Sequence, residues 1–424
     1  MIFMPASRME IKGMANMKTE RSFATPLSQV RRDETLLAKF TQIEARMLAA
    51  HATHLGYPYN LSFTPSVPPL LGDYLINNLG DPYAGSHYAS EVCAEERESI
   101  TWLMRLWGCH DTTEYWGSIG TSGTEGNLWG IYLGREMLPD AVLIHSADAH
   151  YSLPKAARIL RIPAVQVASL ANGEIDLADF AAHLTALKGR PVIVALTSGT
   201  TMKGAHDNIA GAILALAAAG YDRDQRYIHV DGALNAMVLP FLQDALPDIQ
   251  PSFEADIDSI STSGHKMIGT PMPCGALVCR RRHIERIAQA VAYLRSNDTT
   301  LMGSRNGHAV LAIWARLIGH GYGGYAQDAL TCSLRAQVVA ETLRGFGVDV
   351  LCNPHALTVV FPQPSEQIVK TYQLACHEGL AHAIIMPNVT DALLVRFAGD
   401  YAAWWANRRT PSQQGASKAQ STST

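Results

Sequence analysis

The sequence predicts an α/β fold, in which a large domain with a mostly parallel sheet precedes a small C-terminal α+β domain. Short β-branched runs alternate with longer helix-like stretches through the middle of the chain, as strands joined by crossover helices do. Several runs are apolar at both odd and even positions, which is typical of strands covered on both faces. This alternation changes after about residue 321, where we expect the second domain to begin.

The individual elements follow from these patterns. Strands of the large domain are predicted at 141–145, 164–169, 191–196, 226–230, 257–261 and 275–279. Helices are predicted between them, among others at 177–187 and 209–219. In the small domain we expect a helix at about 330–346, strands at 348–352 and 357–361, a helix at about 366–378, and strands at 383–386 and 393–397.

The two ends of the chain differ from its middle in composition. Residues 1–25 contain five methionines without periodicity, and residues 407–424 are almost devoid of apolar side chains. Such segments bury too little surface to offset the entropy of ordering, so we expect a disordered leader and a disordered tail. Residues 26–75, rich in Pro and Tyr, are expected to form an N-terminal arm, 76–320 the large domain and 321–406 the small domain.

Composition excludes several classes of protein. Of the 424 residues 47% are hydrophobic and 17% charged, which allows a large core, and the net charge of −4 indicates neither a nucleic-acid nor a membrane partner. The longest apolar run is well short of the roughly 20 residues that span a bilayer. Seven cysteines form no CxxC pair and no secretory segment precedes them, so we expect reduced thiols in a cytoplasmic protein. The sixteen histidines are scattered and indicate no metal site.

Two polar motifs follow predicted strands and indicate chemistry. Lys266 comes after the strand at 257–261, where it is either a surface charge or an amine of lowered pKa that binds an aldehyde cofactor as a Schiff base. Asp231 follows the strand at 226–230. It could cap the next helix, or it could keep a pyridine nitrogen protonated so that the ring becomes an electron sink. The small Ala233 would leave room for a flat ring.

Three further loops also carry polar residues that indicate chemistry. Residues 120–127 place glycines and hydroxyls before a helix, which indicates either a plain N-cap or a cradle for one phosphate monoester. His150, after the strand at 141–145, is either a structural group or an imidazole that stacks on a cofactor ring. Residues 197–208 offer hydroxyls and a carboxylate that could contact a ring oxygen or orient the neighbours of Asp231.

Together these loops predict a pyridoxal phosphate (PLP) site. Each follows a strand of an α/β domain, and ligands of such domains bind at the carboxyl edge of the sheet. A nicotinamide-dependent oxidoreductase would need GxGxxG after the first strand and an acidic residue about 20 positions later, and the chain lacks this motif. A non-catalytic binding protein is disfavoured because Lys266, Asp231 and His150 are all present.

The motifs also resemble those of a known family. They are Gly56-Tyr57-Pro58, INNLGDP at 76–82, GTEGN at 123–127, GTTMKGAHDN at 199–208, HVDGA at 229–233, SGHKMIGTPMPCG at 263–275, GSRNGH at 303–308 and TVVFP at 358–362. The chain is similar to the group II PLP-dependent amino-acid decarboxylases, in the branch of bacterial PLP-type histidine decarboxylase and plant serine decarboxylase. The resemblance implies a carboxy-lyase with PLP fold type I, the aspartate aminotransferase-like fold.

The resemblance also implies roles for individual residues. Lys266 would bind the cofactor aldehyde, Asp231 would pair with the pyridinium, and His150 would stack on the ring. The other cofactor-binding residues would be Thr121, Ser122, Gly123, Thr200, Asp207, Ala233, Ser263 and His265. Members are homodimers or homotetramers with the site at the subunit interface. The segment 293–308 would cross it and bring Tyr293. Tyr293 or a nearby histidine is the candidate proton donor.

The resemblance leaves the substrate open. We expect conversion of histidine to histamine and CO2 first, with Tyr57, Asn60, Ser304 and Ala356 as substrate-contacting residues. Ala356 stands where histidine decarboxylases of this branch have serine, and HAIIMPNVT at 382–390 is more similar to serine decarboxylases. Serine or another small polar amino acid is therefore an alternative substrate, and a decarboxylation-dependent oxidative deaminase that forms an aldehyde is an alternative activity.

Overall fold

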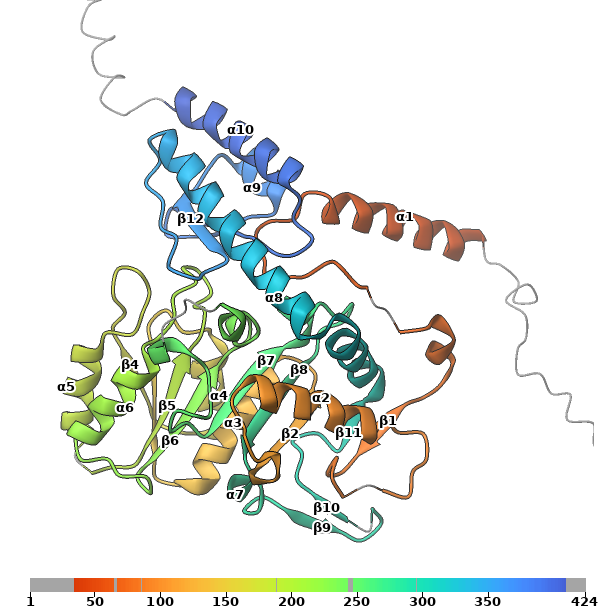
Figure 1. Ribbon diagram of the computed structural model, residues 1–424, viewed down its shortest axis with the longest axis vertical. Coiled ribbons are helices and arrows are strands. Elements are labelled where there is room, and N and C mark those ends of the chain that lie inside the picture. The colour runs from red at the N-terminus through yellow and green to blue at the C-terminus, as the bar shows by residue number, and fades with distance from the viewer. Residues whose placement is uncertain are drawn as a thin grey trace, which may run out of the picture. The chain divides into compact units, whose positions relative to one another are not determined.

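The computed structural model describes residues 34–64, 67–84, 86–187, 189–242, 247–294 and 296–408. The chain divides into two compact units, one that ends at Ala52 and one that begins at Thr53. The first contains helix α1 (Glu34–His51), and the second contains the remaining described elements (Figure 1). The predicted leader at 1–25 and the predicted tail from residue 409 onward lie outside the described residues.

A seven-stranded sheet forms the centre of the second unit, in the order β2-β8-β7-β6-β5-β3-β4. Its strands are β2 (Tyr115–Gly120), β3 (Val142–Ser146), β4 (Ala164–Val167), β5 (Val192–Thr197), β6 (Arg226–Asp231), β7 (Ser259–Ser263) and β8 (Gly275–Arg280). Neighbouring strands are parallel except where β8 pairs with β2 and β7. The predicted α/β class is confirmed. Strand β2 was not predicted, because Gly117 and Gly120 interrupt its apolar pattern.

Helices cover both faces of this sheet. The helices of the second unit are α2 (Cys93–Leu106), α3 (Gly123–Met137), α4 (Ser152–Leu160), α5 (Leu177–Leu187), α6 (Ile209–Ala218), α7 (Arg281–Ile284), α8 (Gly307–Gly345), α9 (Glu366–Tyr372) and α10 (Asp391–Asn407). On β5, Val194 packs in the core that α5 and α6 cover, whereas Ile193 packs in the core under α3 and α4. Successive strand residues face opposite sides, so both parities of a central strand are apolar.

Helix α3 approaches the sheet closely because its inner face is made of glycines. A Cβ on Gly126 would lie 2.8 Å from Cβ of Ser261, and one on Gly130 would lie 2.3 Å from Nδ1 of His229. Gly134 lies on the same face, four residues further on. The helix therefore packs directly on β6 and β7.

The C-terminal part is α+β, as predicted. Its antiparallel sheet has the order β12-β14-β13, with β12 (Thr358–Pro362), β13 (Ala375–His377) and β14 (Leu380–Ile384). Helices α8 and α10 pack against each other, and α8 also packs on β12. Smaller two-stranded pairs are β1 (Asn77–Leu79) with β11 (Ser304–Asn306), and β9 (Gln289–Val291) with β10 (Ser296–Asp298).

Two predictions for this part were wrong. The strand expected at 393–397 belongs to α10, whose buried Leu393, Leu394, Phe397 and Tyr401 recur at helical spacing. A window of five residues is too short to reveal that period. The strand expected at 348–352 forms one isolated bridge with β12, at Leu351.

Two predicted helices begin or end at residues other than those expected. The helix expected at 330–346 is the end of α8, which starts at Gly307 and has a non-helical backbone at Gly321 (φ 66°). The helix expected at 366–378 ends at Tyr372, because Gln373 adopts a left-handed conformation (φ 54°) that stops α9 before β13.

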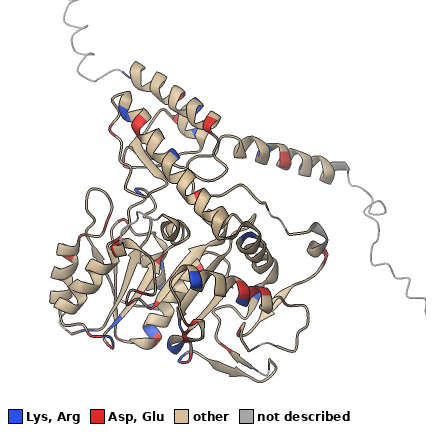
Figure 2. Cartoon of the chain, in the orientation of Figure 1, with Lys and Arg blue, Asp and Glu red and all other residues tan. Residues whose placement is uncertain are grey.

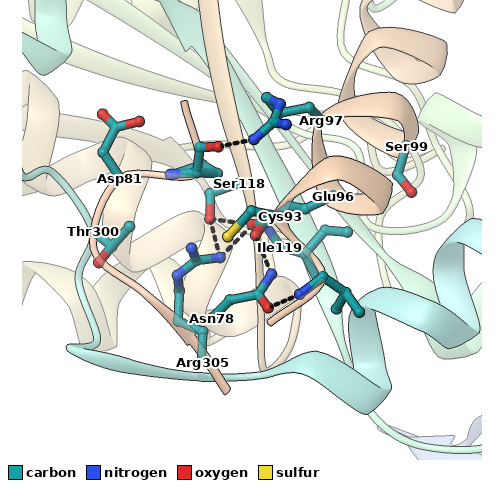
Figure 3. A network of polar contacts seen from close by, with 12 residues as sticks. Asn78, Asp81, Cys93, Glu96, Arg97, Ser99, Ser118, Ile119, Thr300 and Arg305 are labelled. Carbon is teal, nitrogen blue, oxygen red and sulfur yellow. Dashed lines mark hydrogen bonds and ion pairs between the residues drawn. The ribbon is translucent and has the colours of Figure 1, made fainter. Parts of the chain in front are cut away.

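A buried polar cluster connects β2 to the segments that carry INNLGDP and GSRNGH. Glu96 of α2 forms an ion pair with Arg305 of β11, and the two side chains are 0% and 2% exposed. The carboxylate also accepts hydrogen bonds from Ser118 Oγ (2.8 Å), the backbone N–H of Ile119 (2.8 Å) and Asn78 Nδ2 (2.7 Å) (Figure 3). We call these five residues the Glu96 cluster.

Charge and apolar length give no sign of a membrane-spanning segment. Among the described helices none combines the length and the apolar character needed to cross a bilayer. Residues of both charges are spread over helices and loops, and the strands of the central sheet carry few (Figure 2). All seven cysteines are free thiols.

Candidate active site

Strands β2, β3, β5, β6 and β7 run in one direction, and the loops after their carboxyl ends enclose a cavity of about 350 Å³. This is the sheet edge at which α/β domains bind ligands. The structure brings ten predicted site residues together in the cavity wall: Tyr57, Ser122, Gly123, His150, Thr200, Asp231, Ala233, Ser263, His265 and Lys266.

Lys266 lies in an irregular turn that starts where β7 ends. The turn Gly264–Ile268 is π-helical, but Lys266 itself has non-helical angles (φ −86°, ψ −123°). Asn60, a predicted substrate contact, supports this turn instead of lining the cavity: its backbone N–H donates to His265 O (3.3 Å) and its Nδ2 to Met267 O (3.1 Å). Burial lowers the pKa of the Lys266 amine, which favours the neutral form that attacks an aldehyde.

Asp231 is the last residue of β6 and is 3% exposed. Its Oδ1 accepts a hydrogen bond from the backbone N–H of Ala233 (3.1 Å), and its Oδ2 accepts one from Nδ2 of Asn127 (2.7 Å). Two donors from different elements fix the direction of the carboxylate. It is placed to hold a cationic ring nitrogen of a ligand in the cavity.

His150 follows β3, and Ser152 sets its tautomer. Nδ1 of His150 lies 3.2 Å from the backbone N–H and 2.8 Å from Oγ of Ser152. Because a backbone N–H can only donate, Nδ1 is the acceptor and Nε2 carries the proton. Burial lowers the pKa of His150, so the ring is a neutral, partly apolar surface.

The N-terminus of α3 forms the side of the cavity predicted to hold phosphate. Ser122 is the N-cap, and its Oγ accepts from the backbone N–H of Glu125 (3.3 Å). A Cβ on Gly123 would lie 2.4 Å from Oγ of Ser263, so only glycine fits there. Thr121 does not line the cavity, because its N–H and hydroxyl both donate to Glu125 Oε2 at 2.6 Å. Helix N–H groups beside serine hydroxyls suit an anion.

Asp207 also lies outside the cavity wall. Its carboxylate, 1% exposed, accepts from the backbone N–H groups of Ile175 (2.8 Å) and Thr197 (2.7 Å). Burial raises its pKa to about 7. Asp207 therefore supports the backbone of the loop that carries Thr200, and Thr200 lines the cavity.

The remaining predicted site residues, Ala356, Ser304 and Tyr293, do not line the cavity. Ala356 is 1% exposed and lies beside the cavity residue Gly204, where an added Cβ would be 3.2 Å from Ala356 Cβ. Ser304 is exposed in β11. Tyr293, the predicted proton donor, is 84% exposed and does not line the cavity of its own chain.

Several cavity residues had no predicted role. Asn127 lies within the GTEGN motif, whose glycines and hydroxyls drew attention to the phosphate alone. Tyr59 stacks with Tyr57, with ring centroids 5.8 Å apart. His382 of β14 has each ring nitrogen 3.0 Å from a backbone carbonyl of another segment. Both contacts of His382 join segments that are far apart in the sequence, so only the tertiary structure reveals them.

The wall has the chemistry that PLP requires: an amine, a carboxylate, an imidazole and a helix N-terminus. Within the described part of the chain, two buried polar atoms of this wall, Thr197 Oγ1 and His265 Nδ1, have no hydrogen-bond partner. Buried polar groups normally have hydrogen-bond partners, and a polar ligand in the cavity would supply them. The residues present therefore fit the cofactor.

Comparison with known proteins identifies the family. The sequence profile of the pyridoxal-dependent decarboxylase conserved domain matches residues 25–362. The chain belongs to the pyridoxal-dependent decarboxylase family. This decarboxylase is 42% identical over 357 residues to serine decarboxylase 1 of Oryza sativa subsp. japonica, covering 83% of this chain and 73% of the rice protein. It is 39% identical over 345 residues to histidine decarboxylase of Pseudomonas fluorescens, covering 81% and 84%.

The fold agrees with that family. The crystal structure of L-methionine decarboxylase from Streptomyces sp.590 superposes with a TM-score of 0.77 over 88% of this chain and 96% of that chain, at 24% identity. The predicted PLP fold type I is thus confirmed. The protein is a PLP-dependent amino-acid carboxy-lyase, as the resemblance implied.

His229 makes the stability of the decarboxylase pH-dependent. Burial lowers its pKa from 6.5 to about 4, so the unfolded chain takes up this proton at higher pH than the folded protein. Stability is therefore complete above pH 6.5 and decreases as the pH falls to about 4, by about 3 kcal/mol. We expect the urea midpoint of His229→Gln to depend less on pH over this range than that of wild type, measured by tryptophan fluorescence. Parallel curves would contradict this assignment.

Proposed function

We propose that this cavity decarboxylates a small polar L-amino acid to a primary amine and CO2, with histidine as first candidate and serine as second. The observation that carries the proposal is the convergence of Lys266, Asp231 and His150 on one cavity, in a chain of this family. Hydrogen bonds fix the positions of Asp231 and His150, and Lys266 lies in the turn Gly264–Ile268 that starts where β7 ends.

The roles follow from these positions. Lys266 would supply the neutral amine for the cofactor aldehyde, and Asp231 would keep a proton on the pyridine nitrogen. The cofactor, when bound, supplies the electron sink for the electron pair that the departing carboxylate leaves. His150 would pack on the ring, and Ser122, Gly123, Ser263 and His265 would hold the phosphate. Thr200 and Ala233 complete the wall.

Different observations favour the two substrates. The stacked Tyr57 and Tyr59 in the wall offer ring faces to a flat imidazole, which favours histidine. Three rice serine decarboxylases, 39–42% identical to this chain, favour serine. Histidine decarboxylases of bacteria and tomato are 37–39% identical. Both substrates therefore belong in the test.

A substrate panel tests the proposal. Purified holoenzyme is incubated with each of the common L-amino acids, and amine, CO2, ammonia and aldehyde are followed. We expect amine and CO2 in equal amounts from histidine, and Lys266→Ala to form neither. Amine and CO2 from serine alone would identify serine, the second candidate, as the substrate. Aldehyde with ammonia would show the oxidative reaction instead, and no CO2 from any amino acid would overturn the proposal.

We further propose a cytoplasmic homodimer or homotetramer with the site at a subunit interface. Tyr293 is 84% exposed and outside its own cavity, so a role in catalysis requires the cavity of another copy. Helix α1 carries Leu36, Leu37, Phe40, Ile43, Met47 and Leu48 in one apolar stripe, which an isolated helix cannot bury. Seven free thiols suit a reducing compartment.

A further inference from the structure

The side-chain amide of Asn127, 1% exposed, uses all of its hydrogen-bonding capacity. Its Nδ2 donates to Asp231 Oδ2 (2.7 Å) and to Ser152 Oγ (2.8 Å). Its Oδ1 accepts from Ser261 Oγ (2.7 Å) and from His229 Nε2 (3.0 Å). An amide has two N–H donors and two acceptor positions, so four residues from three elements, α4, β6 and β7, determine where this group points.

The network permits one orientation of the amide. If Oδ1 faced Asp231, two acceptors would lie 2.7 Å apart, so Nδ2 must face the carboxylate. His229 then donates from Nε2, and its Nδ1 accepts from Ser259 Oγ (2.8 Å). The hydroxyl of Tyr227 in turn donates to Ser259 Oγ (2.9 Å). This buried chain holds Asn127 from the side away from the cavity.

A second branch leads from Asn127 to His150. Ser152 Oγ accepts from Asn127, so its own proton is free to point at Nδ1 of His150, 2.8 Å away. The backbone N–H of Ser152 donates to the same nitrogen (3.2 Å). The proton of His150 consequently stays on Nε2.

We propose that Asn127 is a positioning residue for the cofactor. Together with the backbone N–H of Ala233, its amide fixes the direction of the Asp231 carboxylate. Through Ser152 Oγ it also directs a second donor at Nδ1 of His150, whose tautomer the backbone N–H of Ser152 already sets. The inference rests on the proposed roles of Asp231 and His150. Asn127 itself belongs to the helix α3 whose glycine face lies directly on β6 and β7, which is why its short side chain reaches both strands.

The substitution Asn127→Asp tests the inference at nearly constant shape. It places a second carboxylate oxygen opposite Asp231 Oδ2, where like charges repel and one of the two must be protonated. Cofactor affinity is measured by titrating PLP into the stripped protein, and the bound cofactor's visible absorption is followed against pH. We expect about tenfold weaker affinity and a shift of the absorption midpoint in the same direction as in Asp231→Asn.

Asn78→Asp is the matched control. Asn78 is fully buried, and its Nδ2 also donates to a carboxylate, that of Glu96 (2.7 Å), away from the cavity. We expect both variants to unfold at lower urea, but only Asn127→Asp to change cofactor affinity and the absorption midpoint. An unchanged affinity and midpoint in Asn127→Asp would overturn the inference and leave Asn127 a structural residue.

Two further variants separate the possible failures. If Asp231→Asn leaves affinity and midpoint unchanged, the role of Asp231 itself is wrong, whatever Asn127 does. If Asn127→Asp does not fold, Ser261→Ala replaces it, because this removes one donor to Asn127 Oδ1 and spares Asp231. A smaller shift of the same sign supports the inference, and no shift opposes it.

Discussion

Co-expressed Lys266→Ala and Tyr293→Phe subunits are expected to give decarboxylase activity that neither variant shows alone. Lys266→Ala lacks the amine that bonds the cofactor, and loss of a general acid such as the Tyr293 hydroxyl costs about 10²–10⁴-fold in rate. In a hybrid of the proposed homodimer, one cavity would contain Lys266 and receive the intact Tyr293 of the other subunit. Each isolated hybrid dimer has one complete site of two, so its activity should return to about half that of wild type.

The measurement is the rate of CO2 release from the co-purified hybrid, isolated with a different affinity tag on each variant. The two homo-oligomers, each co-expressed with itself, are the controls. The exposed position of Tyr293, outside its own cavity, motivates the experiment. Hybrids as inactive as the parents would show that Tyr293 does not act in another subunit's cavity.

The sequence predicted the large domain well because its signals are local. Buried parallel strands such as β5 are apolar over most of their length, here from Val192 to Leu196, and α5 matches its predicted range. The signal failed where a strand contains glycines, as β2 does, and where the window covered little more than one helical turn, as at 393–397 in α10. Gly321, with its non-helical backbone, lies within α8, whose two parts were not predicted as one element.

The site residues that could be predicted from the sequence are those that the sheet topology brings together. Parallel strands end at one edge, so Lys266, Asp231 and His150 meet although they are far apart in sequence. Thr121 and Asp207 have side chains that could bind a cofactor, but both make hydrogen bonds within the protein instead. Thr121 donates to Glu125, and Asp207 accepts from backbone N–H groups. Asn127 went unassigned because its role lies in contacts with β6 and β7, which a sequence does not show.

Arg305→Met is expected to destabilise the protein by about 3–5 kcal/mol, because it leaves a buried carboxylate without its counter-charge. Glu96 is 0% exposed and keeps only neutral donors, Ser118, Ile119 and Asn78. Urea unfolding followed by tryptophan fluorescence measures the loss. Lys370→Met, which breaks an ion pair whose side chains are 74% and 79% exposed, should change stability by less than about 1 kcal/mol.

The double variant Glu96→Gln with Arg305→Met distinguishes charge from packing. Removing both charges spares the cost of an unpaired buried ion, so the double variant should be more stable than Arg305→Met alone. The Glu96 cluster also anchors β11, at the end of the segment that carries Tyr293, so Arg305→Met should lower activity in folded protein as well. A double variant less stable than Arg305→Met would mean that the carboxylate is satisfied without Arg305, and that the ion pair is not what holds this segment to β2.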